Sequence, residues 1–433
     1  MSSTSPLRIL LIGNGGREHT LAWKLSQSEK VESIHVVPGN GGTAGVPKCQ
    51  NVTSVKDTDF AGLVEQAKAQ NINLLLPGPE ATLVAGITDY FNEHAPAIKV
   101  FGPTQSAARM EGSKTFSKDF MKRHNIPTAA YENFTDYGKA RNYMDVVSHP
   151  VVIKADGLAA GKGVIIPKDN HEARKALESI MADREFGEAG NSVVIEECLE
   201  GEEISILSLS DGQTILSLPP AQDHKRIGDG DTGPNTGGMG TYAPTPLVTK
   251  AQLDEIDRKV LQPTIQGMAA EGMPFRGCLF TGLMMTKNGP RVLEYNVRFG
   301  DPESQSCLPL LCNDLADLML ACCDGALSEH KLEISSLSAC TVVVAASGYP
   351  GSYAKGTPMK VQPPKEEDGM YVFHAGTGLG GDGQLKTSGG RVIAATATGD
   401  DLKAAVDKAY KGVGCIEFDG MQYRKDIAQR ALR

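Results

Sequence analysis

Short apolar runs alternate with segments of helical periodicity through the first hundred residues. The runs LRILLI (7–12), SIHVV (33–37) and NLLLP (73–77) predict buried strands, and residues 18–28 and 60–70 predict helices between them. Consecutive parallel strands need such crossover helices, so this order predicts a parallel sheet. Ligands of such sheets bind beyond the carboxyl ends of the strands, and we expect a binding site there.

Two further regions follow the predicted sheet, as expected for a chain of 433 residues. Residues 105–125 predict one helix of about five turns that ends before Pro127. After it come β-rich runs around a glycine loop, a helix and more strands. From about residue 330, ACTVVVAASG and GGRVIAATATG predict strands and DLKAAVDKAYKGV a closing helix. The sequence therefore predicts an α/β protein of several domains.

Charge and cysteine content narrow the function. The net charge of −9 argues against a nucleic-acid-binding surface as the main purpose and gives no reason to expect a membrane partner. No stretch approaches the roughly 18 apolar residues that cross a bilayer, and the first residues lack the pattern of a secretory signal. The nine cysteines include no CxxC pair. We therefore expect reduced thiols in a cytoplasmic protein.

The 48 glycines gather in clusters between apolar segments, where backbone can approach phosphates or form moving loops. GNGGREH (13–19) follows a strand and opens a helix, so it favours a phosphate site, with a plain tight turn as the alternative. Glu18 stands where the dinucleotide pattern G-x-G-x-x-G needs its last glycine. An NAD site is therefore disfavoured, and a sugar phosphate remains plausible.

Two other glycine clusters suggest loops over a ligand. GLAAGKG (157–163) differs from a Walker A loop in its spacing and last residue, and it connects two strands. With Lys154 before it and Lys162 within it, it predicts a lid on a polyphosphate or else a flexible surface hairpin. GDGDTGPNTGGMG (228–240), after DHKR, is either a surface loop or a cover that excludes water from a substrate.

RVLEYNVRFGDPE (291–303) is the most specific stretch. Glu294 and Asn296 alternate on a predicted strand and so share one face, with Arg298 two residues further. A salt-bridged surface would also explain these residues. Mg²⁺ prefers oxygen ligands, usually one or two carboxylates with substrate phosphates, and a guanidinium can stabilise a transferring phosphoryl group. The pattern therefore favours phosphoryl transfer from a metal nucleotide.

The histidines are scattered. His19, His224 and His374 fall in glycine-rich or charged loops, and we interpret each as a hydrogen-bonding residue and not as a catalytic base. The cysteines, including Cys322 and Cys323, are interpreted as core thiols.

These motifs resemble the ATP-grasp superfamily. The features that carry the resemblance are Lys114 on a helix, Lys154 before a glycine hairpin, the VVIEECLEGEEIS segment and the E-x-N-x-R strand. GNGGREH, PGPE, DHKR, GPNTGGMG and RFGDPESQ are similar to the phosphoribosylamine glycine ligase family, from about residue 7 to the end of the chain.

The resemblance implies three domains. They are an N-terminal parallel-sheet domain over 1–105, a central ATP-grasp domain over 106–327 with a mobile lid near 125–192, and a small C-terminal mixed α/β domain over 328–433. In vertebrates this ligase is often the first part of a longer multifunctional chain. Other enzymes of purine synthesis are therefore candidate partners.

The resemblance also implies a reaction. ATP, glycine and 5-phosphoribosylamine would give glycinamide ribonucleotide, ADP and phosphate, a step of de novo purine biosynthesis. The glycine carboxylate would attack the γ-phosphate, and the sugar amine would then take the acyl carbon of glycyl phosphate. No enzyme nucleophile is needed, so the protein would position the substrates, neutralise charge and exclude water.

Individual roles follow from the matching motifs. Residues expected at ATP are Lys114, Lys154, Glu196, Glu197, Leu199 and, at the ribose, Glu203. Residues expected to bind Mg²⁺ or Mn²⁺ are Glu294 and Asn296. Residues expected at glycine or phosphoribosylamine are Gly15, Gly16, Glu80, Asp223, Arg298, Lys355 and Arg391, the last two as weaker phosphate candidates. Residues with an expected catalytic role are Arg298, Lys154 and Asp223.

One position departs from the wider superfamily. Many members carry another metal-binding carboxylate on the strand before E-x-N, and FTGLMM (280–285) offers none. The metal would then depend more on Glu294 and on the phosphates. Three other interpretations stay open: a different ATP-grasp ligase or carboxylase, a non-catalytic sensor of ATP and a sugar phosphate and, less favoured, an NAD oxidoreductase.

Overall fold

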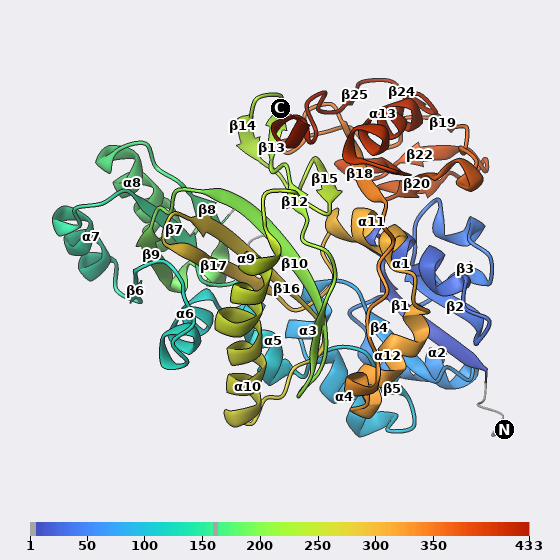
Figure 1. Cartoon of the computed structure of the whole chain (residues 1–433), viewed down its shortest axis with the longest axis horizontal. Helices are drawn as coiled ribbons and strands as arrows, with labels where there is room; N and C mark the ends of the chain where they lie inside the picture. The colour runs from blue at the N-terminus through green and yellow to red at the C-terminus, as the bar shows by residue number, and fades with distance from the viewer. Residues whose placement is uncertain (1–5, 159–162, 433) are drawn as a thin grey trace.

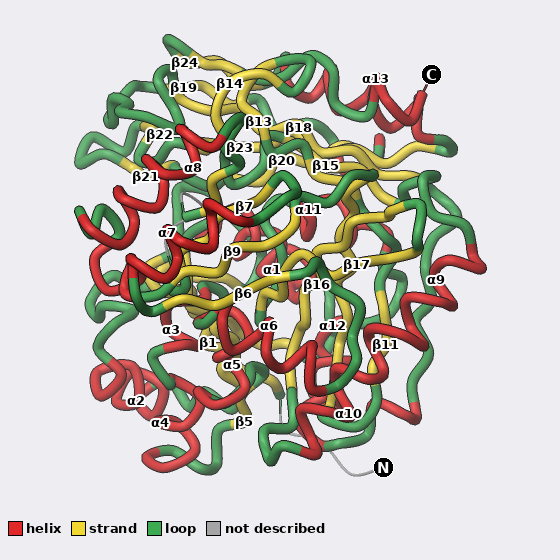
Figure 2. Tube along the Cα trace, turned by 90° about the vertical axis from the view of Figure 1, so that its left-hand side faces the viewer, coloured by secondary structure: helices red, strands yellow, loops and turns green. Residues whose placement is uncertain are grey.

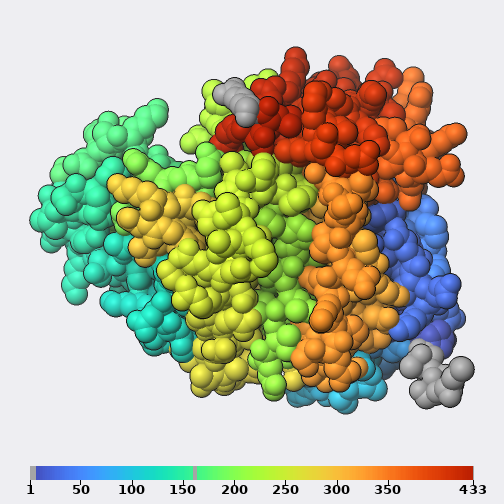
Figure 3. All heavy atoms as spheres, viewed as in Figure 1, coloured from blue at the N-terminus to red at the C-terminus, as the bar shows by residue number. Residues whose placement is uncertain are grey.

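The computed structural model describes residues 6–158 and 163–432. Figure 1 shows an N-terminal part, a lobe on the opposite side that carries α7 (Tyr137–Val146) and α8 (Asn170–Leu177), and a C-terminal part above the N-terminal part. In Figure 3 that lobe projects from the rest of the surface. Within the described ranges, the helices are too short or too polar to traverse a lipid bilayer.

The N-terminal part is a five-stranded parallel sheet with the order β3-β2-β1-β4-β5. Its strands are β1 (Leu7–Gly13), β2 (Val31–Pro38), β3 (Cys49–Asn51), β4 (Leu74–Pro77) and β5 (Lys99–Val100). The predicted strands and the helices α1 (Gly16–Ser26) and α2 (Phe60–Ala69) are confirmed. The chain runs outward from β1 through β2 and β3, then returns to β4 on the other side of β1. The ends of β1 and β4 are therefore the switch point where such sheets bind ligands.

The prediction of one helix over 105–125 is wrong. Two helices, α5 (Gln105–Gly112) and α6 (Lys114–Arg123), meet at Ser113. The Ser113 hydroxyl accepts a hydrogen bond from the Phe116 N–H at 3.2 Å, so Ser113 caps α6. Glycine followed by a serine that bonds the backbone favours a break over a continuous helix. The break places Lys114 at the first position of α6.

The projecting lobe is built on a second sheet with the order β6-β9-β7-β8, in which β6, β9 and β7 run side by side in Figure 2. Its strands are β6 (Tyr131–Phe134), β7 (Val151–Ala155), β8 (Val164–Ile165) and β9 (Val193–Glu197). The helices α7 and α8 pack on it through a core of their own that includes Met144, Ile153 and Leu177. GLAAGKG connects β7 to β8 as predicted, but its Lys162 lies outside the described residues.

A central antiparallel sheet joins the lobe to the rest, with the order β11-β10-β16-β17. Its strands are β10 (Glu202–Asp211), β11 (Ile215–Ser217), β16 (Arg276–Thr286) and β17 (Gly289–Asn296). The helices α9 (Lys250–Ile256), α10 (Gln262–Ala270) and α12 (Leu315–Asp324) pack on this sheet. Elsewhere, α3 (Glu80–Val84) and α4 (Ile87–His94) lie beside β4 and β5, and α11 (Glu303–Cys307) lies beside α1 and β15.

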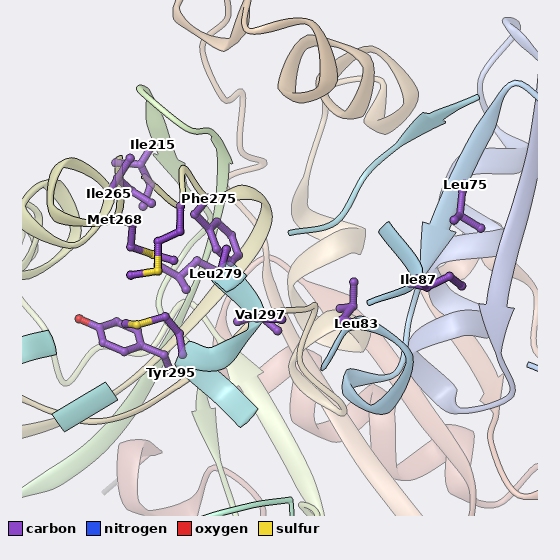
Figure 4. Close-up of a cluster of buried hydrophobic side chains, with 14 of the residues drawn as sticks. Leu75, Leu83, Ile87, Ile215, Ile265, Met268, Phe275, Leu279, Tyr295 and Val297 are labelled. Carbon is purple, nitrogen blue, oxygen red and sulfur yellow. The ribbon is translucent and has the colours of Figure 1, made fainter. Parts of the chain in front are cut away.

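One apolar core extends from the N-terminal sheet into the central sheet. It includes Leu75 and Leu83 on the N-terminal side and Phe275, Leu279 and Tyr295 on the central side (Figure 4). Burial of this continuous core holds the two parts together, because separating them would expose apolar surface to water. The core thereby fixes the end of β17 relative to the end of β4.

The C-terminal part contains an antiparallel sheet whose strands come from two regions of the chain. Its order is β12-β15-β18-β23-β20, and β25 also pairs with β18. The strands are β12 (Gln222–Asp223), β15 (Gly240–Ala243), β18 (Ser338–Ala346), β20 (Met370–His374), β23 (Arg391–Gly399) and β25 (Met421–Gln422), with α13 (Leu402–Val413) packed on them. Since β12 and β15 precede residue 327, this sheet crosses the expected boundary. The division of the chain at 105 and 327 stays a prediction.

Three two-stranded ribbons complete the structure. They pair β13 (Arg226–Gly228) with β14 (Thr232–Asn235), β19 (Met359–Val361) with β24 (Ile416–Phe418), and β21 (Thr377–Leu379) with β22 (Leu385–Thr387).

Replacing Ser113 with Ala should lower the free energy of unfolding by about 1 kcal/mol, because the cap of α6 is lost. The midpoint of urea unfolding measures this loss. Ser106→Ala, at an exposed position of α5, is the control. Equal midpoints for the two variants would contradict the assignment of Ser113 as the cap.

Candidate active site

A cavity of about 840 Å³ lies where the three parts of the molecule meet. It brings together most of the residues expected at the site, namely Gly15, Glu80, Lys114, Lys154, Glu196, Glu197, Leu199, Glu203, Asp223, Glu294, Asn296, Arg298 and Arg391. Two expected residues are not among the described residues that line it. The backbone of Gly16 packs against Gln305, and Lys355 is exposed in the segment between β18 and β19.

The predicted metal ligands lie side by side on β17. Glu294 is opposite Gly282 and Asn296 opposite Phe280 on β16, and both side chains line the cavity. Burial alone would raise the pKa of Glu294, but Lys225, Lys154 and Lys114 outweigh burial and hold that pKa below its usual value. Glu294 is therefore an ionised carboxylate at neutral pH.

The donor set at β17 fits a hard divalent cation. Glu294 offers a carboxylate and Asn296 an amide oxygen, which also accepts a hydrogen bond from Arg298 at 3.3 Å. Across residues 6–158 and 163–432, no group of three or more His, Cys, Asp or Glu side chains converges as a closed metal site would require. Two protein oxygens suit Mg²⁺-type coordination, in which phosphates and water supply the remaining ligands.

Arg298 is held between two carboxylates. Its guanidinium lies 3.0 Å from Glu111 and 3.4 Å from Glu80, and these charges raise its pKa against the opposing effect of burial. The other Glu111 oxygen accepts a hydrogen bond from the Val297 N–H at 2.7 Å. Glu111 was not among the residues predicted from the sequence. Its place on the buried face of α5, beside Ala107 and Met110, was a signal that could have found it.

Lys118, Lys154 and Glu196 form a buried ion-pair triad in the lining of the cavity. The Glu196 carboxylate pairs with both lysines, and all three side chains are almost completely buried. Lys154 also donates to the carbonyl of Leu293 at 3.0 Å. Burial lowers the pKa of Lys118 to about 8 although Glu196 opposes this shift. Lys118, which lies one helical turn after Lys114 on α6, was not among the residues predicted from the sequence.

Further charges line the opposite wall. Lys225 pairs with Glu203 and lies 4.0 Å from Glu294. Burial, and then the neighbouring Glu303, raise the pKa of Asp223 well above its usual value. The pKa of Glu303 is raised as well, first by burial. Asp223 and Glu303 therefore form a buried acidic pair, and the role of Glu303 was not foreseen although RFGDPE contains it.

The switch-point loops meet at this cavity. Gly15 follows β1 and Glu80 follows β4, as expected for adjacent parallel strands. Glu18 accepts a hydrogen bond from the Gly15 N–H at 2.7 Å, which caps α1. Glu18 occupies the position where a dinucleotide motif has its last glycine. Its role as the cap of α1 explains why a glycine is absent there.

The glycine cluster PGNGGTAG (38–45) has a different role from GNGGREH. A Cβ on Gly41 would lie 2.5 Å from Leu385, and one on Gly42 would lie 2.6 Å from His374. These glycines allow the C-terminal part to approach the N-terminal sheet.

Three domain models of one family together match most of the chain. They are the phosphoribosylglycinamide synthetase N domain over residues 7–111, its ATP-grasp (A) domain over 112–304 and its C domain over 339–430. The chain belongs to the phosphoribosylglycinamide synthetase family. The predicted family resemblance and α/β fold are confirmed, and the ATP-grasp family uses ATP with a divalent metal.

Known members of the phosphoribosylglycinamide synthetase family extend this comparison. The phosphoribosylamine–glycine ligase of Vibrio cholerae is 49% identical over 427 residues, covering 98% of this chain and 99% of its own. The bifunctional purine biosynthetic protein ADE1 of Schizosaccharomyces pombe is 56% identical over 99% of this chain, which spans 54% of that protein's length. The crystal structure of the Thermotoga maritima phosphoribosylamine–glycine ligase matches with a TM-score of 0.82 at 33% identity, covering 98% of this chain and 100% of the other.

The three histidines act as hydrogen-bonding residues in this family member, as predicted. His19 accepts from the His374 N–H at 2.7 Å, His374 contacts Thr377 at 3.1 Å, and His224 accepts from the Ala428 N–H at 3.2 Å. Burial lowers the pKa of His19 to about 3 and that of His224 and His374 to about 4, so all three are neutral at pH 7.

The different burial of Glu111 and Glu80, the two partners of Arg298, predicts that their replacement will destabilise the fold by different amounts. Glu111→Gln should lower the free energy of unfolding by about 3 kcal/mol, since it breaks a buried pair. Glu80→Gln should cost less than about 1 kcal/mol, because Glu80 is more exposed and lies further from the guanidinium. Urea unfolding of both variants measures the difference. Equal or reversed losses would count against Glu111 as the main support of Arg298.

Proposed function

We propose that this chain ligates glycine to 5-phosphoribosylamine at the expense of ATP, forming glycinamide ribonucleotide, ADP and phosphate. The observation that carries the proposal is the single cavity into which all three parts of a phosphoribosylglycinamide synthetase converge. A reaction of three substrates needs such convergence, because each must reach the others without release of an intermediate. The names of the full-length bacterial relatives support the same reaction.

The nucleotide is proposed to lie between the projecting lobe and the central sheet. Lys114 and Lys154 would contact its phosphates, with Glu196, Glu197 and Leu199 near the adenine and Glu203 near the ribose. Apolar side chains on both walls support a base at this place, namely Leu158, Val164 and Ile166 on the lobe and Phe280, Met284 and Leu293 on the sheet. Leu158 is 39% exposed and Ile166 50%, so a bound base would cover apolar surface.

Glu294 and Asn296 are proposed to hold Mg²⁺ or Mn²⁺. When bound, such an ion neutralises charge on the phosphate tail. Arg298, fixed by Glu111 and Glu80, would stabilise the charge of the phosphoryl group during transfer.

Glycine and phosphoribosylamine are proposed to occupy the side of the cavity away from the lobe. The buried pair Asp223 and Glu303 suits an ammonium group, because a cation beside two neighbouring buried carboxyl groups would offset their mutual repulsion. Gly15, Gly16 and Glu80 would meet phosphoribosylamine, and Arg391 is a phosphate candidate. Lys355 is the weakest candidate because it is exposed and lies outside the lining.

The reaction proceeds without a protein nucleophile. A carboxylate oxygen of glycine would bond to the γ-phosphorus as the bond to the ADP oxygen breaks. The amine of phosphoribosylamine would then bond to the acyl carbon, phosphate would leave, and the amine nitrogen would lose a proton. The buried thiols are poor alternatives, since burial raises the pKa of Cys307 and Cys322 and keeps them protonated.

The proposed compartment is the cytoplasm, supported by nine free cysteines. Other purine-pathway enzymes are proposed partners, since related chains occur in bifunctional and trifunctional purine biosynthetic proteins.

Glu294→Ala should lower the rate of product formation at least about 100-fold, as expected when charge stabilisation at the transferred group is lost. Mass spectrometry of products from ATP, Mg²⁺, glycine and fresh phosphoribosylamine measures this. Lys287→Ala, in the exposed turn before β17, is the control and should remain active. Near-normal turnover of Glu294→Ala would refute its role. Wild-type ADP release with another amino acid or bicarbonate, but not glycine, would favour a different ATP-grasp enzyme.

Lys154→Met should weaken ATP binding by about tenfold or more, the size expected when a hydrogen bond to a charged group is lost. Isothermal titration of Mg·ATP in the absence of glycine measures the affinity. Lys168→Met is the matched control, because Lys168 lies in the same lobe with its side chain 87% exposed. Unchanged affinity in Lys154→Met would contradict the assigned phosphate contact.

A further inference from the structure

The hairpin of β13 and β14 has little buried apolar surface to fix its position on the rest of the molecule. It spans residues 226–235 and overlaps the glycine-rich segment 228–240, whose backbone has unusual conformational freedom at Gly230, Gly233 and Gly238, all at positive φ. Residues 229–234 are exposed, so apolar burial contributes little to fixing the tip. The conformation of the hairpin must therefore depend on specific polar contacts.

Arg424 supplies two of these contacts from the far end of the chain. It is 2% exposed and is the largest of the fully buried side chains. Its guanidinium donates to Asp231 at 2.8 Å and to the carbonyl of Arg226 at 3.2 Å, on both sides of the hairpin. Asp426 accepts two further hydrogen bonds, each of 2.7 Å, and so fixes the orientation of the guanidinium.

The neighbours of Arg424 add contacts to the same hairpin. The Gly230 N–H donates to Asp426 at 2.8 Å, and the Lys425 N–H donates to Asp229 at 2.8 Å. Arg430 lies 3.4 Å from Asp231. Figure 1 shows the C-terminus beside β13 and β14, in agreement with these contacts. We call residues 424–430 the clasp.

The hairpin and the two residues that follow it form one wall of the cavity. Arg226, Asp231, Asn235, Thr236 and Gly237 line it. At the base, Arg391 donates to the carbonyl of Gly237 at 2.7 Å. The clasp therefore fixes the tip of a segment whose base lies beside the proposed glycine site. Release of the tip would leave only the base contacts to keep this wall closed.

We propose that Arg424 is a positioning residue for the ligase reaction, which keeps the β13–β14 hairpin closed over the glycyl phosphate intermediate. The inference rests on the proposed function. If the wall opens, water can bond to the acyl carbon while the bond to the phosphate oxygen breaks, which returns glycine and phosphate. The net reaction is then hydrolysis of ATP without ligation, so Arg424 governs how well the two half-reactions are coupled.

The ratio of ADP formed to glycinamide ribonucleotide formed tests this inference. The wild-type ratio should be close to one. In Arg424→Gln we expect the ratio to rise at least about threefold and kcat/KM for phosphoribosylamine to fall about tenfold, with ATP affinity unchanged. The ratio of Arg424→Lys should lie between those of the wild type and Arg424→Gln, because lysine keeps the charge but cannot form the planar fork of hydrogen bonds. Lys425→Gln, which alters an exposed side chain of the clasp, should behave as wild type.

A second variant and a second measurement keep the test decisive. Asp229→Ala removes one clasp contact at an exposed position outside the lining, so it should fold normally and raise the ratio to a smaller extent. Amide hydrogen exchange over residues 226–237 should be faster in both variants. A ratio of one with wild-type exchange in both would overturn the inference. Absence of product from the wild type would instead overturn the proposed function, while the exchange result would still test the clasp.

Discussion

The mutual neutralisation of charges buried around one cavity is the constraint on which the rest of the structure depends. An isolated charge removed from water is costly, so each lysine or arginine that faces the cavity needs a carboxylate nearby. Glu196 meets this need for Lys118 and Lys154, and Glu111 meets it for Arg298. These pairs fix the cationic groups before any substrate is present, which is the preorganisation that phosphoryl transfer requires.

The placement of these charges depends in turn on the packing of separate sheets. The core shared by the N-terminal and central sheets sets the end of β4 against the end of β17, and Arg298 can then reach Glu80 from across that junction. The antiparallel sheet that contains β12, β15, β18 and β23 positions the C-terminal part in the same way. Because β12 pairs with β15 and β15 with β18, Asp223 is carried to the cavity by a sheet that Arg391 also belongs to. The same sheet packing that stabilises the fold therefore also brings the residues of the site together.

The sequence predicted features that local pattern determines. Continuous apolar runs identified β1, β2 and β4, and alternation placed Glu294 and Asn296 on one face of β17. It did not predict features that distant partners determine. Short strands such as β3 and β5 exist because a neighbouring strand pairs with them, and β12 joins a sheet whose other strands, except β15, lie more than a hundred residues later. Glu111 and Lys118 were missed for the same reason, because the role of a charged residue on a helix can be assigned only when its buried partner is known.

The need to neutralise buried charges also explains why carboxylates that are expected to bind ATP or its metal lie beside lysines in this structure. Glu203 pairs with Lys225, and Glu294 lies close to that lysine as well. In the proposed complex, Glu203 would bind a ribose hydroxyl and Glu294 would bind a divalent cation. The triphosphate would provide new acceptors for the lysines. Binding would therefore exchange one set of charge partners for another and leave few groups unpaired. A site built in this way can keep its ionised groups in place when empty, and still release them when the nucleotide and its cation enter together.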